Sequence, residues 1–369
     1  MKILKVSVIM GMFLLCFSFN AYAAKTSAKS AVLINADTFS VLYSHNMTER
    51  LPMASTTKIM TALILAEQNT PQKTITVTEN MVKVEGSSMG LRAGDTVTYH
   101  DLLYGILLPS GNDAANAAAI SVAGSIEKFA ILMNKKVADF GLHNTNFVTP
   151  SGLDANGHFT TAYDLAVIAA NALKNENFAL AAASYTAKVK INDTTITLKN
   201  HNKLLKIYDG AIGVKTGFTK ASGRCLVSAA KKGNTTLIAV TLNDKNDWQD
   251  HTDLLDYGFS LTTETTVAPK NNTKISVLNQ AEETINAVFK PLTITTTPGD
   301  DITYKVVLPS VVFSPVKKGD VIGYTLFYVN GKQIGKTNIT ADSEHINTVI
   351  EQNFYKKLFN TYKTLLRSL

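Results

Sequence analysis

The chain has 369 residues, of which 45% are apolar and 18% are charged, and its formal net charge is +7. This balance is that of a globular protein with enough material for two or three domains, and it excludes a disordered chain. No long internal repeat is present in the sequence, which excludes a solenoid.

The first 23 residues have the pattern of a signal peptide. Lys2 and Lys5 form a short positive segment, residues 6–19 are almost continuously apolar, and Ala21-Tyr22-Ala23 supplies the small residues that signal peptidase recognises. The apolar run is short for a membrane span. We expect export and cleavage after Ala23, which leaves 34 basic against 29 acidic residues and a net charge of +5. Export argues against nucleic acid as a partner.

Cleavage leaves Cys225 as the only cysteine, so no intramolecular disulfide can form. A lone cysteine is more often a small buried residue than a nucleophile. Cysteine and histidine residues do not cluster with the spacing of metal ligands, and we expect neither a metal nor another cofactor.

The segment after the signal peptide reads as an α/β unit with strands at both ends and helices between them. Two strands are predicted at 30–35 and 40–43, joined by a turn at 36–38. Helices are predicted at 55–68, at 102–108 after a capping pattern at Thr98, from a cap at Asp113 to about 123, at 125–140 and at 160–174. Strands are then predicted at 188–198, 210–217, 224–230 and 235–242, and a closing helix at 253–261.

The composition changes near Thr262. Residues 262–348 are rich in Thr, Val and Ile, with turn signals at regular spacing, and Asn330-Gly331 is a strong hairpin signal. Many short strands of this kind predict a small all-β sandwich. We therefore divide the chain into a signal peptide (1–23), a first domain (24–261), a β domain (262–348) and a C-terminal helix (349–369).

Residues 351–369 have the pattern of an amphipathic helix. At 100° per residue, six apolar side chains fall within about 120° of one another and four basic side chains lie opposite. The apolar set is Phe354, Leu358, Tyr362, Leu365, Leu366 and Leu369, and the basic set is Lys356, Lys357, Lys363 and Arg367. The segment is too polar to span a bilayer and has the form of an interfacial helix. The alternative is a helix that packs on its own domain or on a protein partner.

Four Ser-x-x-Lys motifs occur, at Ser55, Ser125, Ser228 and Ser314, so the motif alone has little weight. Ser55 differs from the others because it lies at the predicted first turn of an apolar helix, after a proline-led loop. Lys58 lies three residues later on the same helix face and can reach the Ser55 hydroxyl. Without this context Ser55 would be interpreted as a helix cap.

Two further motifs complete a set. Ser110-Gly111-Asn112 separates two predicted helices, and Lys215-Thr216-Gly217 ends a predicted strand. Taken singly, the first is a turn with a helix cap and the second an ordinary strand end. The order Ser-x-x-Lys, Ser-x-Asn, Lys-Thr-Gly, with 55 and then 105 residues between the first residues of successive motifs, is that of class A β-lactamases and penicillin-binding proteins.

The sequence around all three motifs resembles the low-molecular-mass penicillin-binding proteins of the D-alanyl-D-alanine carboxypeptidase family. The resemblance is carried by LPMASTTKIMTA at 51–62, LYGILLPSGNDAA at 103–115 and GVKTGFT at 213–219, and it extends over nearly the whole chain. It implies an α/β (α+β) penicillin-binding/β-lactamase-like transpeptidase domain with helices and an antiparallel sheet, then a small all-β sandwich domain and a C-terminal amphipathic helix.

The resemblance implies covalent acyl transfer. Ser55 attacks the carbonyl between two terminal D-alanines, and Lys58, kept neutral by burial and by the nearby charge of Lys215, is the base. Ser110 relays a proton to the leaving D-alanine, and water releases the acyl-enzyme.

The same resemblance assigns the binding residues. Asn112 binds the substrate amide, Lys215 and Thr216 bind the terminal carboxylate, and Gly217 lets the substrate backbone approach the strand edge. The backbone N–H groups of the nucleophile and of Phe218 form the oxyanion hole. The implied partners are pentapeptide stems of peptidoglycan, β-lactam antibiotics as covalent inhibitors, and an anionic membrane surface that binds the C-terminal helix at the outer face of the cytoplasmic membrane.

Three other segments resemble family features less specifically. Residues 86–91 resemble a loop near the mouth of the site, residues 150–154 resemble a site-lining segment, and His201 lies where some relatives carry an arginine. A plain structural loop remains the alternative for each.

Several other functions compete with this hypothesis. A serine β-lactamase of class A needs a glutamate to activate water, and residues 143–165 contain no glutamate, only the carboxylates of Asp154 and Asp164. A β-lactam-binding sensor or a non-catalytic wall-binding module would not require a full catalytic set. Endopeptidase action on cross-links would use the same site.

Overall fold

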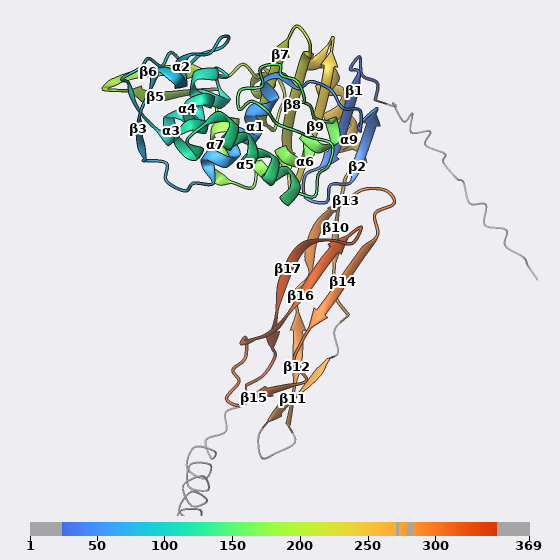
Figure 1. Ribbon diagram of the computed structural model, residues 1–369. Helices are drawn as coiled ribbons and strands as arrows, with labels where there is room; N and C mark the ends of the chain where they lie inside the picture. Colours follow the sequence, from blue (N-terminus) through green and yellow to red (C-terminus); the bar gives the residue numbers. More distant parts are fainter. Residues whose placement is uncertain (1–23, 271–272, 279–282, 345–369) are drawn as a thin grey trace, which may run out of the picture.

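The computed structural model describes residues 24–270, 273–278 and 283–344. The predicted signal peptide and C-terminal helix lie outside the described residues. Figure 1 shows two parts: a wide part in which helices pack on a sheet, and a narrow part made of strands that extends away from it.

A five-stranded antiparallel sheet, in the order β2-β1-β9-β8-β7, supports the first part. Its first and last strands in sequence pair directly, with Ala31 opposite Thr241, so the two ends of this part meet. The hairpin expected at 30–43 and the later strands are confirmed. The strands are β1 (Ser30–Asn35), β2 (Val41–His45), β7 (Ala211–Thr219), β8 (Gly223–Lys232) and β9 (Thr235–Asp244). Strand β7 lies at the edge of this sheet and pairs only with β8 among the described strands.

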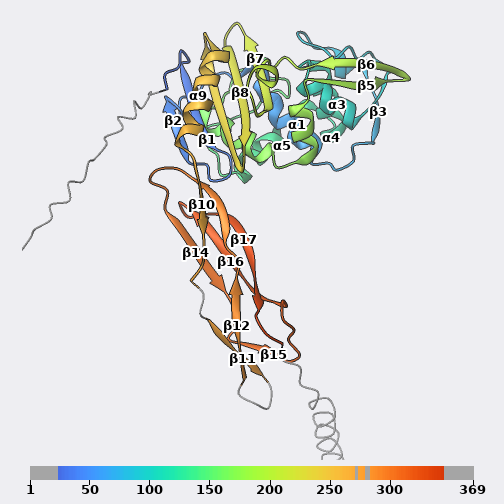
Figure 2. The ribbon, with the colours of Figure 1, turned by 180° about the vertical axis from the view of Figure 1, so that it is seen from behind.

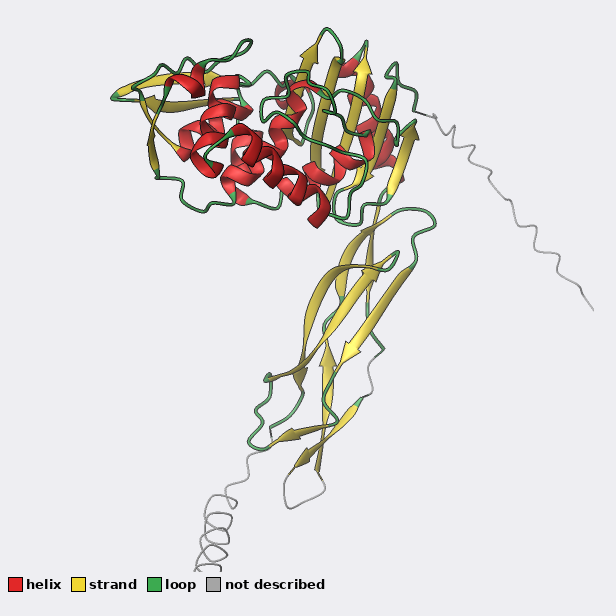
Figure 3. Cartoon of the chain, viewed as in Figure 1, coloured by secondary structure: helices red, strands yellow, loops and turns green. Residues whose placement is uncertain are grey.

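Helices cover the sheet and form a second lobe beside it (Figure 3). The helix that ends at Leu261 packs on β8 and β9, and the helix that begins at Ala162 packs on the same sheet. The helical elements are the 3-10 turn η1 (Ala54–Thr57) and α1 (Lys58–Ala66), α2 (Glu79–Val82), α3 (Tyr99–Leu107), α4 (Asn112–Ala123), α5 (Ile126–Asp139), α6 (Ala162–Ala172), α7 (Glu176–Ala183), α8 (Leu204–Ile207) and α9 (Asp247–Leu261). Within the described residues no single helix has the length and hydropathy of a bilayer span, and α4 with α5 reaches that mark only as a pair bent by 84°.

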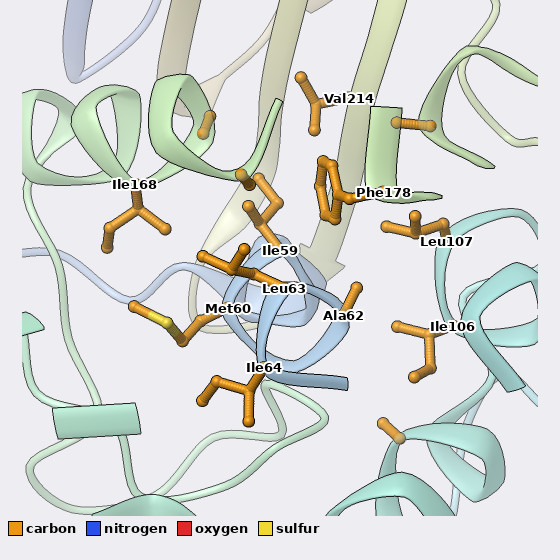
Figure 4. Packing of buried hydrophobic residues seen from close by; sticks show 14 of the residues in the cluster. Ile59, Met60, Ala62, Leu63, Ile64, Ile106, Leu107, Ile168, Phe178 and Val214 are labelled. Atoms are coloured by element: carbon orange, nitrogen blue, oxygen red, sulfur yellow. The ribbon is translucent and has the colours of Figure 1, made fainter. Parts of the chain in front are cut away.

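Helix α1 runs through the centre of the helical lobe. All nine of its residues are buried, and all but Lys58 and Thr61 are apolar, as expected for a helix that is covered on all sides rather than along one stripe. Figure 4 shows Ile59 and Leu63 packed towards Phe178 and Val214, which links α1 to α7 and to β7. This packing fixes the start of α1, and with it Ser55, relative to the edge strand.

Parts of the sequence-based prediction were wrong. Residues 188–198 form a hairpin of β5 (Thr186–Ile191) and β6 (Thr194–Lys199) rather than one strand, because Asn192 turns the chain with a φ of 55°. Helix α7 and the short pair β3 (Thr74–Thr76) and β4 (Thr96–Thr98) were not predicted. Asp113 is not the cap of α4, since Gly111 holds that position.

The second part is built from two sheets and is β-sandwich-like, as the sequence predicted. One sheet has the order β14-β16-β17-β12-β11-β15, and the other pairs β10 with β13. Asn330 and Gly331 turn the β16–β17 hairpin with φ angles of 50° and 77°, as their sequence indicated. The strands are β10 (Thr263–Val267), β11 (Lys274–Leu278), β12 (Glu283–Phe289), β13 (Leu292–Thr296), β14 (Ile302–Val307), β15 (Val311–Phe313), β16 (Val321–Val329) and β17 (Lys332–Ala341).

The two parts touch at the end of the first sheet (Figures 1 and 2). Ser40 Oγ donates to Asp300 Oδ1 at 3.2 Å and accepts from Asn330 Nδ2 at 3.2 Å, and the hydroxyls of Thr235 and Thr295 lie 2.8 Å apart. The contact is polar, and it lies away from the three motifs.

Candidate active site

Ser55 lies on the 3-10 turn η1 immediately before α1. The sequence predicted one helix from Ser55, whereas the α-helix begins only at Lys58. Ala54 enters the turn with a φ of 47°, a left-handed conformation that is uncommon outside glycine. The tight turn holds the Ser55 hydroxyl at the surface of the cleft while the residues around it are buried.

Lys58 lies three residues beyond the serine, and its side chain is completely buried. Its Nζ lies 3.0 Å from Ser55 Oγ and donates to Asn112 Oδ1 and to the backbone carbonyl of Ser151, each at 2.6 Å. Burial lowers the pKa of Lys58 well below its ordinary value, and the charge of Lys215 lowers it further, while Asp113 opposes both effects. The site therefore favours the neutral amine.

A neutral amine has two N–H bonds and one lone pair. Asn112 presents its oxygen to Lys58 because its Nδ2 donates to the carbonyl of Glu85 at 2.6 Å. The Ser151 carbonyl can only accept, so the two oxygens take both N–H groups of Lys58. The lone pair is then left for the Ser55 hydroxyl, which is the arrangement a general base requires.

Ser110 lies in the break between α3 and α4 with a φ of 63° and is 3% exposed. Its hydroxyl lines the cleft and has no hydrogen-bond partner among the described residues. A buried polar atom without a partner is rare in native proteins and often marks a functional site. Ser110 is therefore available to a bound substrate.

The Lys-Thr-Gly motif lies on the edge strand β7. Lys215 is 1% exposed, its Nζ donates to the Thr216 carbonyl at 3.0 Å, and burial lowers its pKa to about 7. A Cβ atom on Gly217 would lie 3.0 Å from the backbone nitrogens of Ser55 and Thr56, so glycine allows this strand to lie directly against the nucleophile turn. The backbone of β7 beyond Gly217 faces the cleft along an edge that no other described strand pairs with.

These elements enclose a cleft of about 480 Å³. Ser55, Ser110, Thr216, Gly217 and Phe218 line it, and the Phe218 side chain is 66% exposed. Lys58, Asn112 and Lys215 are buried behind this wall. The structure thus brings all eight predicted site residues into one place. Further lining residues are Ser87, His201, Arg224, Cys225, Asp247 and Trp248.

Asn112 is engaged at both ends of its amide, by Lys58 and by Glu85, and its binding of a substrate amide stays a prediction. Cys225 is buried, as expected for a lone cysteine, and burial raises the pKa of its thiol to about 11. A thiol held in its protonated form is a poor nucleophile.

Sequence reasoning missed the residues that support the site from behind. His158 is buried, and its Nε2 lies 2.8 Å from Thr57 Oγ1 while its Nδ1 accepts from the Val148 N–H at 2.9 Å. It ties the loop that carries the Ser151 carbonyl to the turn that carries the nucleophile. The only available signal was the weak resemblance at 150–154, because a backbone carbonyl leaves no mark in a sequence.

A partly exposed serine beside a buried lysine of lowered pKa, a second hydroxyl that lines the cleft and an open strand edge define a site for serine acyl transfer. The comparisons with known proteins agree. Residues 18–246 match the family described as D-alanyl-D-alanine carboxypeptidase, and residues 263–346 match the one described as penicillin-binding protein 5, C-terminal domain. The chain belongs to the D-alanyl-D-alanine carboxypeptidase family and is a serine-type hydrolase.

Individual relatives cover most of the chain. The D-alanyl-D-alanine carboxypeptidase DacF of Bacillus subtilis is 34% identical over 368 residues, which span 93% of this chain and 95% of the relative. DacC of Escherichia coli is 32% identical over 353 residues, 87% of each chain. The crystal structure of penicillin binding protein 5 from Haemophilus influenzae is 27% identical with a TM-score of 0.64, covering 88% of this chain and 98% of that one. The Streptomyces K15 DD-transpeptidase is 34% identical with a TM-score of 0.62, covering 64% and 98%.

Proposed function

We propose that Ser55 is the nucleophile and Lys58 the base in the removal of the terminal D-alanine from peptidoglycan stem peptides. The observation that carries this proposal is the Lys58 amine, whose two N–H groups are taken by Asn112 and Ser151 while its lone pair is left for Ser55. Ser55 transfers its proton to Nζ as Oγ bonds to the carbonyl carbon of the penultimate D-alanine.

The acyl-enzyme forms when the bond to the terminal D-alanine breaks. The proton that Nζ took from Ser55 passes through the Ser110 hydroxyl, which lies in the cleft, to the leaving nitrogen. Water then attacks the ester and releases the shortened peptide, and Ser55 recovers its proton.

The substrate extends along the free edge of β7 as an additional strand, since its backbone groups can pair with an unpaired edge. Lys215 and Thr216 bind the terminal carboxylate, and Asn112 lies beside the substrate amide. The backbone N–H groups of Ser55 and Phe218 bind the oxyanion, for which the close contact between Gly217 and the nucleophile turn is suited.

β-Lactams acylate Ser55 by the same route, which accords with the penicillin-binding names of the relatives. A role as a class A β-lactamase is not favoured by the carboxylates of the 143–165 segment. Asp164 accepts from the Asn144 N–H and the Thr145 hydroxyl, and Asp154 accepts from the Thr219 hydroxyl. Both serve local structure.

The enzyme is exported and acts at the outer face of the cytoplasmic membrane. The basic, amphipathic pattern of residues 351–369 supports peripheral attachment, with residues 262–348 as a spacer domain between the membrane and the catalytic domain at 24–261. Deleting 351–369 should release an active enzyme from anionic liposomes. Unchanged pelleting of the truncated protein would show that attachment lies elsewhere.

A direct test is incubation of the purified protein with a pentapeptide that ends in D-Ala-D-Ala and measurement of free D-alanine. The wild-type protein should release it, and the Ser55→Ala variant should not. Steady hydrolysis of a β-lactam without release of D-alanine would favour the β-lactamase alternative instead.

A further inference from the structure

Asp113 is a buried carboxylate next to Asn112, in the first turn of α4, and it is 2% exposed. It has no salt bridge in the described part of the chain. Burying a charge without a cation is costly unless hydrogen bonds replace the lost water. Asp113 obtains these bonds almost entirely from one loop, residues 88–91.

The loop donates four hydrogen bonds to this carboxylate. Ser88 Oγ donates at 2.5 Å, and the backbone N–H groups of Met89, Gly90 and Leu91 donate at 3.0, 3.1 and 3.0 Å. A single carboxylate on α4 therefore accepts all four of these hydrogen bonds from residues 88–91. This differs from the helix-capping role that the sequence indicated for Asp113.

Residues 85–87, which lead into this loop, orient Asn112. The side-chain nitrogen Nδ2 of Asn112 donates to the Glu85 carbonyl at 2.6 Å, and its backbone N–H donates to the Ser87 carbonyl at 2.7 Å. Gly86 lies between these carbonyls, and a Cβ atom there would come within 2.8 Å of Asn112 Nδ2. Because Nδ2 is held by the loop, Oδ1 must face Lys58.

Asp113 also acts on Lys58 through its charge. Lys215 on β7 is the other charge that acts on Lys58. His158 contacts the neighbouring Thr57, Asp154 acts on His158, and His201 lies near Lys215. Burial and Lys215 lower the pKa of Lys58, and Asp113 raises it. A fixed negative charge favours the ammonium that forms when Lys58 takes the proton of Ser55.

We infer that Asp113 is a positioning residue for the Ser55–Lys58 pair. Its carboxylate fixes the 85–91 loop, the loop fixes Asn112, and Asn112 fixes the direction of the Lys58 lone pair, while the charge supports the protonated base. This inference rests on the proposed role of Lys58.

The test measures the rate of acylation by penicillin between pH 6 and 10 in Asp113→Asn and Ser88→Ala. Asp113→Asn removes the charge and replaces one of the two accepting oxygens by an NH2 group that cannot accept, whereas Ser88→Ala removes one loop contact and keeps the charge. Acylation requires neutral Lys58, so losing the anion lowers the pKa of Lys58 and moves the acidic limb of the profile to lower pH. In Asp113→Asn we expect this shift together with a plateau of the acylation rate that is at least tenfold lower than in the wild type. In Ser88→Ala we expect the acidic limb of the rate profile to stay at the wild-type pH.

Burial lowers the pKa of Lys215 to about 7, so this residue also titrates in the measured range. Both variants keep Lys215, so its effect on the rate profile is the same in each. A limb in Asp113→Asn that stays in place or moves to higher pH overturns the inference. Lys58→Ala is measured alongside. If the Lys58→Ala variant is still acylated by penicillin, the proposed base is wrong. If Lys58→Ala is not acylated but the acidic limb of Asp113→Asn stays at the wild-type pH, only the role of Asp113 is refuted.

A second pair of variants tests the loop even if Asp113→Asn does not fold. Gly86 and Gly90 have similar φ angles of 89° and 94°, but a Cβ on Gly90 has nothing within 4 Å, whereas one on Gly86 meets Asn112. Gly86→Ala should lower the acylation rate at least tenfold relative to Gly90→Ala, with no movement of the limb. Equal rates in the two variants would show that the loop does not position Asn112.

Discussion

Lys58 is the side chain whose environment has the clearest chemical consequence. Replacing it with alanine removes the acceptor that we propose for the Ser55 proton, and general bases contribute about 10²–10⁴-fold to rate. We expect Lys58→Ala to lose penicillin acylation by about that factor. Stopped-flow acylation kinetics with a chromogenic β-lactam would measure it.

The matched control is Lys128→Ala. Lys128 belongs to a second Ser-x-x-Lys motif, but it is exposed, and Ser125 caps α5 through the Lys128 N–H at 3.2 Å. Its replacement should leave acylation unchanged. A Lys58→Ala protein that acylates at the rate of the Lys128→Ala control would show that another group is the base.

At the scale of an element, the 149–152 loop holds the Ser151 carbonyl against the nucleophile turn. A Cβ atom on Gly152 would lie 1.9 Å from the Ala54 carbonyl oxygen, so Gly152→Ala must push the loop away from Lys58. We expect a lower unfolding temperature and at least a tenfold lower acylation rate. The unfolding temperature comes from a calorimetric scan and the rate from the same β-lactam assay.

Gly157→Ala separates backbone strain from this close contact. Gly157 has a φ of 81° against 82° for Gly152, but its Cβ would meet nothing closer than Asn146 Nδ2 at 3.7 Å. It should cost about 1 kcal/mol of stability for the positive φ and leave acylation nearly normal. Equal acylation rates in the two variants would contradict the positioning role of the loop.

The elements that the sequence predicted are those with local signals. Thr98, Ser125 and Thr161 cap α3, α5 and α6 through their side chains, and Gly141 turns the chain after α5 with a φ of 71°. The motif residues were identified because their chemistry lies in their side chains. The Ser151 and Glu85 carbonyls could not be predicted, because every residue has a carbonyl.

Asp113 was misjudged for a related reason. A carboxylate at a helix start is satisfied either by the helix N–H groups or by another segment, and only the tertiary fold decides which. The hairpin β5–β6 was taken for one strand because apolar and polar residues alternate in each of its two arms, and the left-handed turn at Asn192 is not marked by glycine.

Two buried histidines make the stability of the whole molecule sensitive to acid. Burial lowers the pKa of His158 from 6.5 to about 4 and that of His251 to about 3. Between these pKa values the two histidines are protonated in the unfolded chain and neutral in the folded chain. The free energy of unfolding therefore falls as the pH drops below 6.5. For His158 the loss at pH 5 is about 2 kcal/mol relative to pH 7.

Urea unfolding at pH 7 and pH 5 measures this effect. In His158→Gln the difference in unfolding free energy between the two pH values should shrink by about 2 kcal/mol. His143→Gln is the control, since His143 is exposed. A pH dependence that is the same in wild type and His158→Gln would mean that His158 does not stay neutral in the folded protein.

The central claim is that one serine of this chain forms the acyl-enzyme, and it is tested most directly by locating the penicillin adduct. Intact-mass measurement followed by peptide mapping should find one adduct, on Ser55, because the buried Lys58 amine lies 3.0 Å from its hydroxyl and is held by Asn112 and by the Ser151 carbonyl. The adduct should be absent from Ser55→Ala. An adduct on Ser125, Ser228 or Ser314, or labelling that persists in Ser55→Ala, would contradict the account.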